Sequence, residues 1–261
     1  MDYQLQGKTA LVAASSQGLG KAIAEQLVRE GANVMITSRS EEKLAAAQKE
    51  LQKMGTGKVG YQVCDVTNKA DIDNLVQVIV EQFGTIDLLV NNAGGPKMGT
   101  FEQLTDEDWE NAFQLNLLSY IRMIRQVLPY MKKSGGKIVN IASSSIKEPI
   151  PGLLLSNTFR VGITGLTKTL ASELAPYGIL INTIAPGRIA TDRVASLDQM
   201  NAEKRGITAE EVKAEFERTI PLGRYGTPME FANVATFLLS GANTYMTGNS
   251  FLVDGGMIKS L

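Results

Sequence analysis

The chain has 261 residues, of which 44% are hydrophobic and 20% charged, and its formal net charge is −1. A charge this close to zero favours neither nucleic acid nor an anionic membrane surface as a partner. The single cysteine, Cys64, excludes an intrachain disulfide and fits a reducing compartment, so we expect a cytoplasmic protein. The sequence contains no histidine, which removes the commonest metal ligand and acid–base group, and we expect no metal site.

The segment "MDYQLQGKTALVAASS" has no basic leader followed by an apolar core, so we expect no signal peptide. No apolar run approaches the ~20 residues that a membrane-spanning helix needs.

Short apolar runs alternate with longer helical stretches along the whole chain. The runs are nearly continuous in hydrophobicity, which is typical of parallel strands buried on both faces. We predict strands at residues 8–14, 32–37, 58–63, 86–90, 137–142, 179–185 and 250–253. The alternation indicates right-handed βαβ units and an α/β fold, a single doubly wound Rossmann-type domain over residues 1–261.

The first strand runs into a small-residue turn, "AASSQGLG", which opens a helix. Gly18 and Gly20 allow the backbone to approach a ligand, and the helix N-terminus offers free N–H groups to a pyrophosphate. Ala14 replaces one of the three glycines of the dinucleotide fingerprint, so a turn without a cofactor is the alternative. The predicted cofactor contacts here are Ala14, Ser16, Gln17, Gly18, Leu19 and Gly20.

The second strand ends in "ITSRS", where an acidic residue would bind the ribose 2′-hydroxyl of NAD. Thr37, Ser38 and Arg39 stand there instead. A guanidinium beside a hydroxyl suits a 2′-phosphate, so we predict NADP as the cofactor, bound through Ser38 and Arg39, with NAD less favoured. The alternative is that Arg39 is an ordinary exposed arginine.

Other strand ends supply further predicted cofactor contacts, because open α/β sheets bind ligands at the carboxyl ends of their strands. Asp65 in "CDVTN" is placed to accept a hydrogen bond from the adenine amino group, whereas Asn91 and Asn92 could instead satisfy turn groups. Thr191 in "APGRIATDR" either caps the next helix or holds a carboxamide. The predicted contacts in these segments are Asp65, Val66, Asn92, Ala93, Gly94, Pro186, Gly187, Ile189 and Thr191.

Residues 188–227 interrupt the alternation, with no predicted strand and one or two polar helices. An insertion after the carboxyl end of a strand is well placed to cover a substrate, so we predict a lid. A solvated surface excursion is the alternative.

Taken together, these motifs resemble the short-chain dehydrogenase/reductase family, in the style of its bacterial 3-oxoacyl-acyl-carrier-protein reductases. The resemblance covers essentially the whole chain and rests on "AASSQGLG", "CDV", "NNAG", "NIAS", "GLTKTLASELAPYGILIN", "APG" and the closing "VDGG". It implies a seven-stranded parallel sheet with helices on both faces, a bound NAD or NADP, and a homo-oligomer that is a dimer or tetramer.

The resemblance also implies a catalytic set of Asn, Ser, Tyr and Lys. Its asparagine corresponds to Asn116, and its serine to Ser143, which would hydrogen-bond the substrate carbonyl oxygen. Asn116 lies on an apolar helical stripe, where a polar side chain needs partners. The alternatives are a satisfied core asparagine and a plain loop serine. The predicted stripe consists of Trp109, Phe113, Tyr120, Ile124, Val127 and Met131.

The family's tyrosine and lysine positions are occupied by Ser156 and Arg160, in a register fixed by "GLTKTLASELAP". In the family the lysine lowers the pKa of the tyrosine and holds the nicotinamide ribose. A serine hydroxyl is far less acidic than a phenol. Arginine stays protonated, so Arg160 can hold a ribose or an anion but is a poor proton donor. We therefore expect the cofactor site, with Arg160 in it, but not the usual proton transfer.

Three functions fit this variant site. The first is an NADP(H)-dependent oxidoreductase for a carbonyl or alcohol substrate, such as a 3-oxoacyl thioester. In it, Ser143 and Ser156 bind the oxygen and Arg160 stabilises the developing charge. The second is a non-redox enzyme for an anionic substrate. The third is a cofactor-binding sensor or oligomer partner with little turnover.

The proton in the first function needs a source other than tyrosine. Water relayed past Asn116 is one source, and Lys97, Lys147 and Arg188 are others, since Lys97 and Arg188 follow pocket motifs. An acyl-carrier-protein partner would also need a basic docking patch near the pocket. Lys132 and Lys133 could contribute to it, or could simply be charges near a helix C-terminus.

Overall fold

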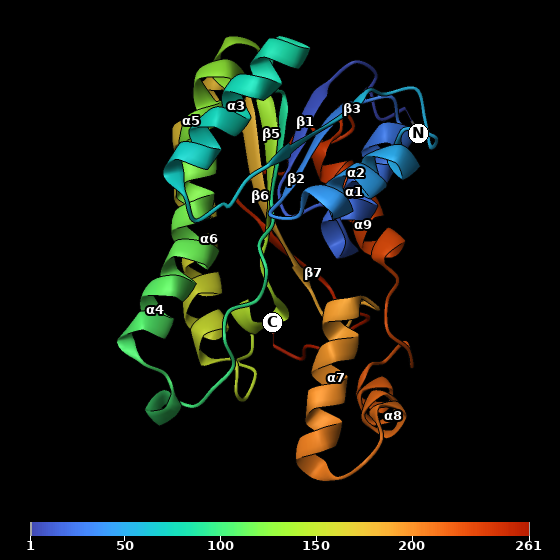
Figure 1. Cartoon of the computed structure of the whole chain (residues 1–261). Helices are drawn as coiled ribbons and strands as arrows, with labels where there is room; N and C mark the ends of the chain where they lie inside the picture. Colours follow the sequence, from blue (N-terminus) through green and yellow to red (C-terminus); the bar gives the residue numbers. More distant parts are fainter. Residues whose placement is uncertain (1, 261) are drawn as a thin grey trace.

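The computed structural model describes residues 2–260 and contains one parallel sheet (Figure 1). The sheet has seven strands in the order β3-β2-β1-β4-β5-β6-β7, and every pair is parallel. The predicted strands and the doubly wound fold are therefore confirmed. The strands are β1 (Thr9–Val12), β2 (Asn33–Ser38), β3 (Val59–Val63), β4 (Leu88–Asn91), β5 (Gly136–Ile141), β6 (Ile179–Pro186) and β7 (Ser250–Val253).

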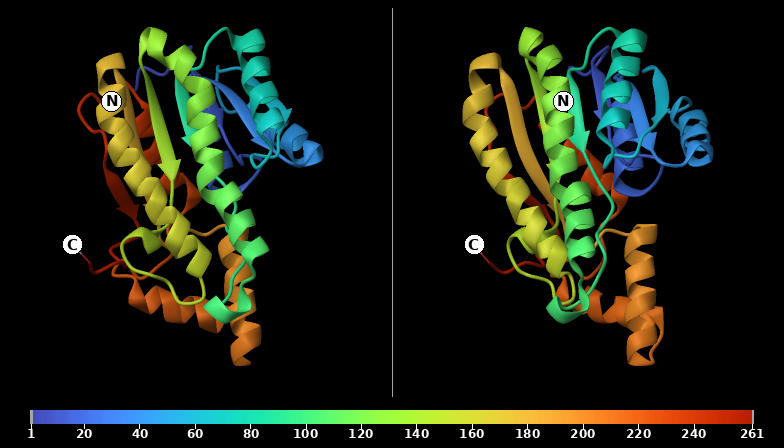
Figure 2. Two further views of the ribbon diagram at one scale, coloured as in Figure 1. Left: turned by 90° about the vertical axis from the view of Figure 1, so that its left-hand side faces the viewer. Right: turned by 60° about the vertical axis from the view of Figure 1, so that its left-hand side comes forward.

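Helices cover both faces of the sheet because the strand side chains alternate between two cores. In β1, Val12 points into one core, packed by α1, α2 and α9, whereas Leu11 points into the other, packed by α3, α5 and α6. Both panels of Figure 2 show α5 and α6 running along the same face. The helices are α1 (Gly18–Arg29), α2 (Glu41–Leu51), α3 (Lys69–Phe83), α4 (Asp106–Phe113), α5 (Ser119–Ser134), α6 (Leu154–Leu174), α7 (Asp192–Arg205), α8 (Ala209–Thr219) and α9 (Pro228–Leu239).

The strand order reverses between β1 and β4, which are neighbours in the sheet but not in sequence. Open α/β sheets bind their ligands outside the carboxyl ends of the strands at such a reversal. Every motif singled out from the sequence as ligand-binding follows the carboxyl end of a strand, so the topology brings them to this one edge.

The predicted apolar stripe around Asn116 is wrong as one continuous helical face. A π-helical segment, Gln114–Leu118, separates α4 from α5. The wider turn rotates α4 relative to α5, and Phe113 is 38% exposed while Tyr120 is 1% exposed. Such insertions are frequent at functional sites, and this one carries Asn116.

The segment 188–227 forms two helices, α7 and α8, beyond the carboxyl end of β6 (Figure 1). A buried ion pair holds α7 against the start of the segment, just after β6 ends at Pro186, since Arg188 Nη1 lies 2.6 Å from Asp198 Oδ1. Tyr225 donates its hydroxyl to the same carboxylate at 2.9 Å, and the Arg188 guanidinium stacks on the Phe216 ring. Both helices are thus packed as one unit with the end of β6.

Candidate functional site

The turn after β1 is shaped for a ligand. Ala14 and Gly18 have left-handed backbone, with φ of +46° and +61°. A Cβ on Gly20 would lie 2.6 Å from the Ala14 carbonyl oxygen, so only glycine fits there. Gln17 occupies the N-cap of α1 without a side-chain hydrogen bond to the helix. The first N–H groups of α1 are left for an anion, as a pyrophosphate site requires.

Three consecutive residues at the end of β2, Thr37, Ser38 and Arg39, have different environments. Thr37 is fully buried and donates its hydroxyl to Gln62 O, so it belongs to the sheet. Ser38 is partly exposed, and Arg39 is exposed with no hydrogen bond or ion pair to any of residues 2–260. A second cation was missed: Lys43 Nζ donates to Gln17 Oε1 at 3.0 Å, beside the β1 turn. Its only sequence signal is its place in the first turn of α2.

Asp65, after β3, is held by its own turn. Its Oδ1 accepts hydrogen bonds from the Thr67 N–H at 2.9 Å and the Thr67 hydroxyl at 2.7 Å. Partial burial acts to raise the pKa of Asp65, but the Thr67 hydrogen bonds and the Arg39 charge lower that pKa overall. The carboxylate therefore stays ionised, with Val66 next to it.

The loops after β4 and β6 complete the edge. Asn92 Nδ2 donates to Ala14 O at 3.2 Å, which joins the β4 loop to the β1 turn. Thr191 is the N-cap of α7 and accepts from the Val194 N–H at 3.4 Å. Gly187, after Pro186, has no room for a side chain, because a Cβ would lie 2.6 Å from Asp254 Cβ.

Asn116 is fully buried and anchors the β4 loop. Its Nδ2 donates to Gly94 O at 2.9 Å, while its Oδ1 has no partner among the described residues. A buried acceptor without a partner is uncommon and needs an explanation, such as a water or a ligand. The structure therefore places Asn116 beside Ala93 and Gly94, two predicted cofactor contacts.

Arg160 is 5% exposed, and its guanidinium points into the protein between β4 and β5. Nη1 donates to Ile141 O at 2.7 Å and to the Tyr120 hydroxyl at 2.9 Å. Nη2 donates to Ala93 O at 3.3 Å, and Nε has no partner among residues 2–260. No carboxylate of the described residues pairs with this buried charge, so a ligand that accepts hydrogen bonds would be stabilised there.

Tyr120 was assigned only to the core, yet its hydroxyl is the partner of Arg160. The hydroxyl donates to Ile141 O at 2.7 Å. Burial raises the pKa of Tyr120 above its ordinary value, although the Arg160 charge opposes that rise. With its proton used in this hydrogen bond and its ring buried, Tyr120 does not replace the missing catalytic tyrosine.

Ser143 and Ser156 lie on neighbouring elements, since α6 packs on the short helix Ser144–Ile146 that follows β5. Ser143 caps that helix by accepting from the Ser145 N–H at 3.2 Å, which leaves its hydroxyl proton free to donate. Ser156, in the first turn of α6, is 8% exposed. Its hydroxyl makes no hydrogen bond within residues 2–260.

Two of the three cations considered as proton sources are already paired with acids. Lys97 Nζ lies 2.7 Å from Asp108 Oδ2 on α4, and Arg188 is bound to Asp198. Lys147 is exposed. Lys97 and Arg188 are thus held by carboxylates of the protein and not directed at a substrate.

The docking patch suggested for Lys132 and Lys133 is wrong in position. Both residues end α5, directly before β5 begins at Gly136, and so lie at the amino end of the strands. Lys132 Nζ lies 4.3 Å from the centre of the Tyr177 ring. The candidate site is at the opposite edge of the sheet.

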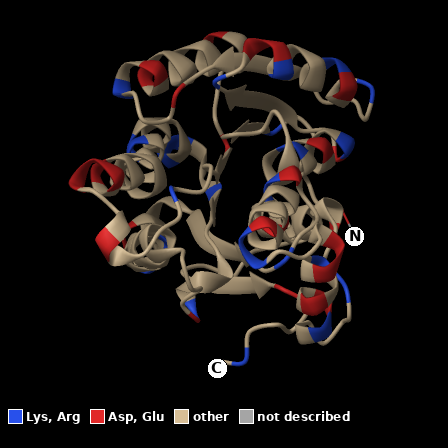
Figure 3. Cartoon of the chain, turned by 60° about the horizontal axis from the view of Figure 1, so that its bottom comes forward, with Lys and Arg blue, Asp and Glu red and all other residues tan. Residues whose placement is uncertain are grey.

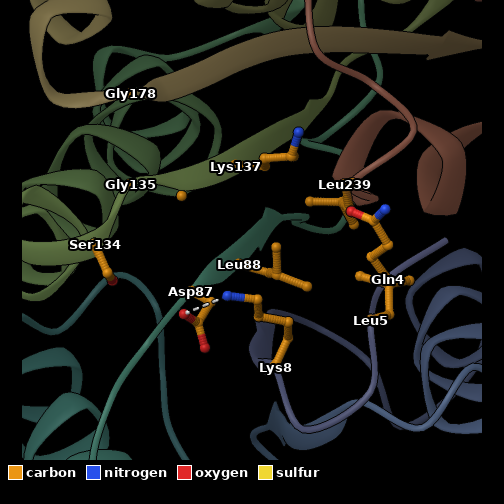
Figure 4. Close-up of a pocket in the computed structure, with 12 residues that line it drawn as sticks. Gln4, Leu5, Lys8, Asp87, Leu88, Ser134, Gly135, Lys137, Gly178 and Leu239 are labelled. Carbon is orange, nitrogen blue, oxygen red and sulfur yellow. Dashed lines mark ion pairs between the residues drawn. The ribbon is translucent and has the colours of Figure 1, made fainter.

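The amino-end edge of the sheet, where Lys132 and Lys133 lie, also holds a small cavity of about 240 Å³, which is separate from the candidate site. Figure 4 shows the Lys8–Asp87 ion pair in it and Lys137 on its wall. Burial lowers the pKa of Lys137, whose ammonium donates to Asn243 O. These contacts join the starts of the strands to one another and to the loop between α9 and β7.

The charge pattern of the remaining surface is mixed. From the end where the strands terminate, basic and acidic positions are interspersed over the helices (Figure 3). Among residues 2–260, no cluster of three or more His, Cys, Asp or Glu side chains could hold a metal ion. Across the same residues, the helices are all too short or too polar to cross a bilayer.

The sequence is similar to those of known reductases. Residues 13–258 match the family model described as enoyl-(acyl carrier protein) reductase. The chain is 38% identical to the 3-oxoacyl-[acyl-carrier-protein] reductase of Aquifex aeolicus, over 98% of this chain and 100% of that one. It is 37% identical to the Vibrio cholerae reductase of the same name, covering 97% and 98% of the two chains.

The chain is also similar to solved structures of reductases and oxidoreductases. The L-sorbose reductase of Gluconobacter frateurii, complexed with NADPH and L-sorbose, superposes with a TM-score of 0.95 at 31% identity over 100% of both chains. An NADPH-bound short chain oxidoreductase of Pseudomonas aeruginosa PAO1, described as containing an atypical catalytic center, has a TM-score of 0.90 at 31% identity. That match covers 99% of this chain and 100% of the other.

Proposed function

The chain belongs to the short-chain dehydrogenase/reductase family, and we propose that it is an NADP(H)-dependent oxidoreductase that interconverts a carbonyl group and an alcohol. Arg160 carries this proposal, because a buried cation without a carboxylate partner occupies the position of the family's ribose-holding lysine. The residues of the site fit a dinucleotide, with free N–H groups on α1 and the exposed Arg39 at the end of β2. When bound, NADPH supplies hydride.

In this proposal, different residues bind different parts of the cofactor. The turn at Gly18 and Gly20, with the α1 N-terminus, holds the pyrophosphate. Arg39, with Ser38, holds the 2′-phosphate by charge-assisted hydrogen bonds. Asp65 and the loop after β4 hold the remaining cofactor groups.

The carbonyl oxygen of the substrate is held by serine hydroxyls in this proposal. Ser143 has a free hydroxyl proton, and Ser156 has no protein partner among the described residues. Two donors aimed at the oxygen stabilise the negative charge that develops on it. The Arg160 guanidinium adds a positive charge behind them that does not depend on pH, since arginine remains protonated.

The proton in this proposal comes from water. Arg160 Nε is a buried donor without a partner, and Asn116 Oδ1 is a buried acceptor without a partner. Both side chains contact the β4 loop, at Ala93 O and Gly94 O. A water bound between a donor and an acceptor satisfies both groups, and it offers a path for a proton to the alkoxide.

The substrate in this proposal is a small carbonyl compound, with 3-oxoacyl thioesters as the first candidates because relatives are named for them. We place the protein in the cytoplasm and propose a homo-oligomer. The exposed apolar side chains of Phe113 on α4 and Val161 on α6 support association.

The proposal is tested by adding NADPH and NADH separately and following fluorescence, then by scanning absorbance at 340 nm against ketones and 3-oxoacyl thioesters. We expect NADPH binding and turnover of at least one carbonyl compound. Binding without any turnover would favour a cofactor-binding protein over an enzyme. Arg160→Ala should weaken NADPH binding, and unchanged affinity would refute the role given to Arg160.

A double variant tests the proton source. Ser156→Tyr with Arg160→Lys restores the residue types that the family uses, and it should raise turnover if the surrounding pocket is intact. Ser156→Phe with Arg160→Lys is the matched control, since it adds the ring without the hydroxyl. A gain in both variants would mean that the ring, and not the proton, limits the reaction.

A further inference from the structure

The first turn of α7 holds an arginine that lies against the β4 loop without a partner. Arg193 Nη2 lies 2.8 Å from the position that a Cβ on Gly95 would occupy. Arg193 is exposed and makes no hydrogen bond or ion pair with the described part of the chain, residues 2–260. Gly95 thus leaves the space that this guanidinium fills.

The location of this contact relates Arg193 to the reacting groups. Three consecutive loop residues are each contacted by one functional side chain: Ala93 O by Arg160 at 3.3 Å, Gly94 O by Asn116 at 2.9 Å, and Gly95 by Arg193. Consecutive Cα atoms are about 3.8 Å apart, so the Gly95 contact lies only about 8 Å along the loop from the Arg160 contact. An anion on Arg193 would therefore lie beside the same loop that Arg160 and Asn116 contact.

Three of the other cations considered for this edge are already engaged by protein groups. Lys97 is paired with Asp108, Arg188 is paired with Asp198, and Arg160 is buried on backbone oxygens. Arg193 is therefore an exposed fork of N–H donors that extends from the segment 188–227 to Gly95 on the β4 loop. Guanidinium geometry matches a carboxylate in a bidentate arrangement.

We propose that Arg193 selects carbonyl substrates that carry a carboxylate a few bonds from the carbonyl group, that is, free oxo acids. This inference rests on the proposed function. A phosphate of the cofactor is the competing anion, but the pyrophosphate has its own donors at the uncapped α1 N-terminus, and the 2′-phosphate has Arg39. Neither needs a guanidinium at Gly95.

The kinetic test compares straight-chain 2-oxo, 3-oxo, 4-oxo and 5-oxo acids with their methyl esters and with a 3-oxoacyl thioester. We expect one acid to be preferred over its ester by roughly 10–100-fold in kcat/KM, as for a charge-assisted hydrogen bond. Arg193→Met should abolish that preference, mainly through KM. Arg218→Met, an exposed arginine on α8 in the same segment, is the matched control and should retain the preference.

A second variant tests the placement of the guanidinium and not its presence. In Gly95→Val the new side chain occupies the space of Arg193 Nη2, so the guanidinium must move. The preference for the acid should fall although Arg193 is retained. An unchanged preference in Gly95→Val would place the anion elsewhere on Arg193.

Binding measurements separate this inference from the proposed function. Calorimetry of the NADPH complex with each oxo acid should show binding that Arg193→Met loses, even if no compound is reduced. If nothing is reduced but this binding is seen, the proposed function fails and the role of Arg193 stands. Equal kcat/KM for acids and esters, binding unaffected by Arg193→Met, or a larger effect on NADPH affinity than on the acid would overturn the inference.

Discussion

Ala14→Gly should stabilise the protein, although it removes a partly buried methyl group from the turn after β1. Ala14 has φ of +46°, in the left-handed region that a Cβ disfavours. That conformation costs an L-residue roughly 1–2 kcal/mol. Glycine removes this cost but loses more entropy on folding, by about 0.4–1 kcal/mol. We expect a net gain of about 0.5–1 kcal/mol in the free energy of unfolding.

The measurement is urea or thermal unfolding of the protein without cofactor. For a domain of this size, each kcal/mol shifts Tm by about 2–4 °C, so a rise of about 1–4 °C is expected. Ala13→Gly is the control, since Ala13 is 2% exposed and has ordinary backbone. It should lower stability, because it loses buried surface and gains unfolded entropy. A loss of stability in Ala14→Gly would refute the claim of strain.

Four further outcomes are expected. Arg39→Ala should weaken NADPH binding by roughly 10–100-fold with little effect on NADH, and equal losses would contradict a 2′-phosphate contact. Burial raises the pKa of Cys64 to about 12, so the neutral thiol should resist Ellman's reagent at about pH 8 until denaturant is added; rapid labelling of the native protein would contradict this. Tyr120→Phe should lower the free energy of unfolding by about 1–3 kcal/mol in urea titrations, because a buried charge-assisted hydrogen bond is lost; an unchanged midpoint would count against it. Turnover should vary little between about pH 6 and 9, because serine and arginine do not titrate there; a sharp inflection would indicate another acid.

The fold was predictable because its strands are apolar on both faces. Side chains such as Leu11 and Val12 enter opposite cores, and this produces continuous hydrophobic runs that only a covered parallel sheet explains. The π-helical turn at Asn116 was not predictable in this way. One extra residue in a turn leaves the apolar pattern of α4 and α5 nearly unchanged, and only the exposure of Phe113 reveals the rotation.

The positions of the site residues could be predicted more readily than their orientations. Sequence motifs located Ser156 and Arg160, because the helix that follows fixes their register. They gave no information on where the guanidinium points, since its partners, Ala93 O and Ile141 O, are backbone atoms that any sequence supplies. The contact of Arg193 could not be predicted either. Its neighbour is Gly95, and the guanidinium fills the space that a side chain on that residue would occupy.

The buried guanidinium also explains why Tyr120 belongs to the site without acting as an acid. A lysine at position 160 would present one small ammonium group, whereas arginine presents a planar fork that needs more acceptors. The Tyr120 hydroxyl supplies one of them at 2.9 Å, and it donates its own hydrogen bond to Ile141 O. The guanidinium is thereby fixed between β4 and β5, and Nε is its one nitrogen that makes no hydrogen bond within residues 2–260. A fixed, permanently charged donor can orient a ligand and stabilise negative charge, but it cannot release a proton, so the proton must come from water or from the substrate's own surroundings.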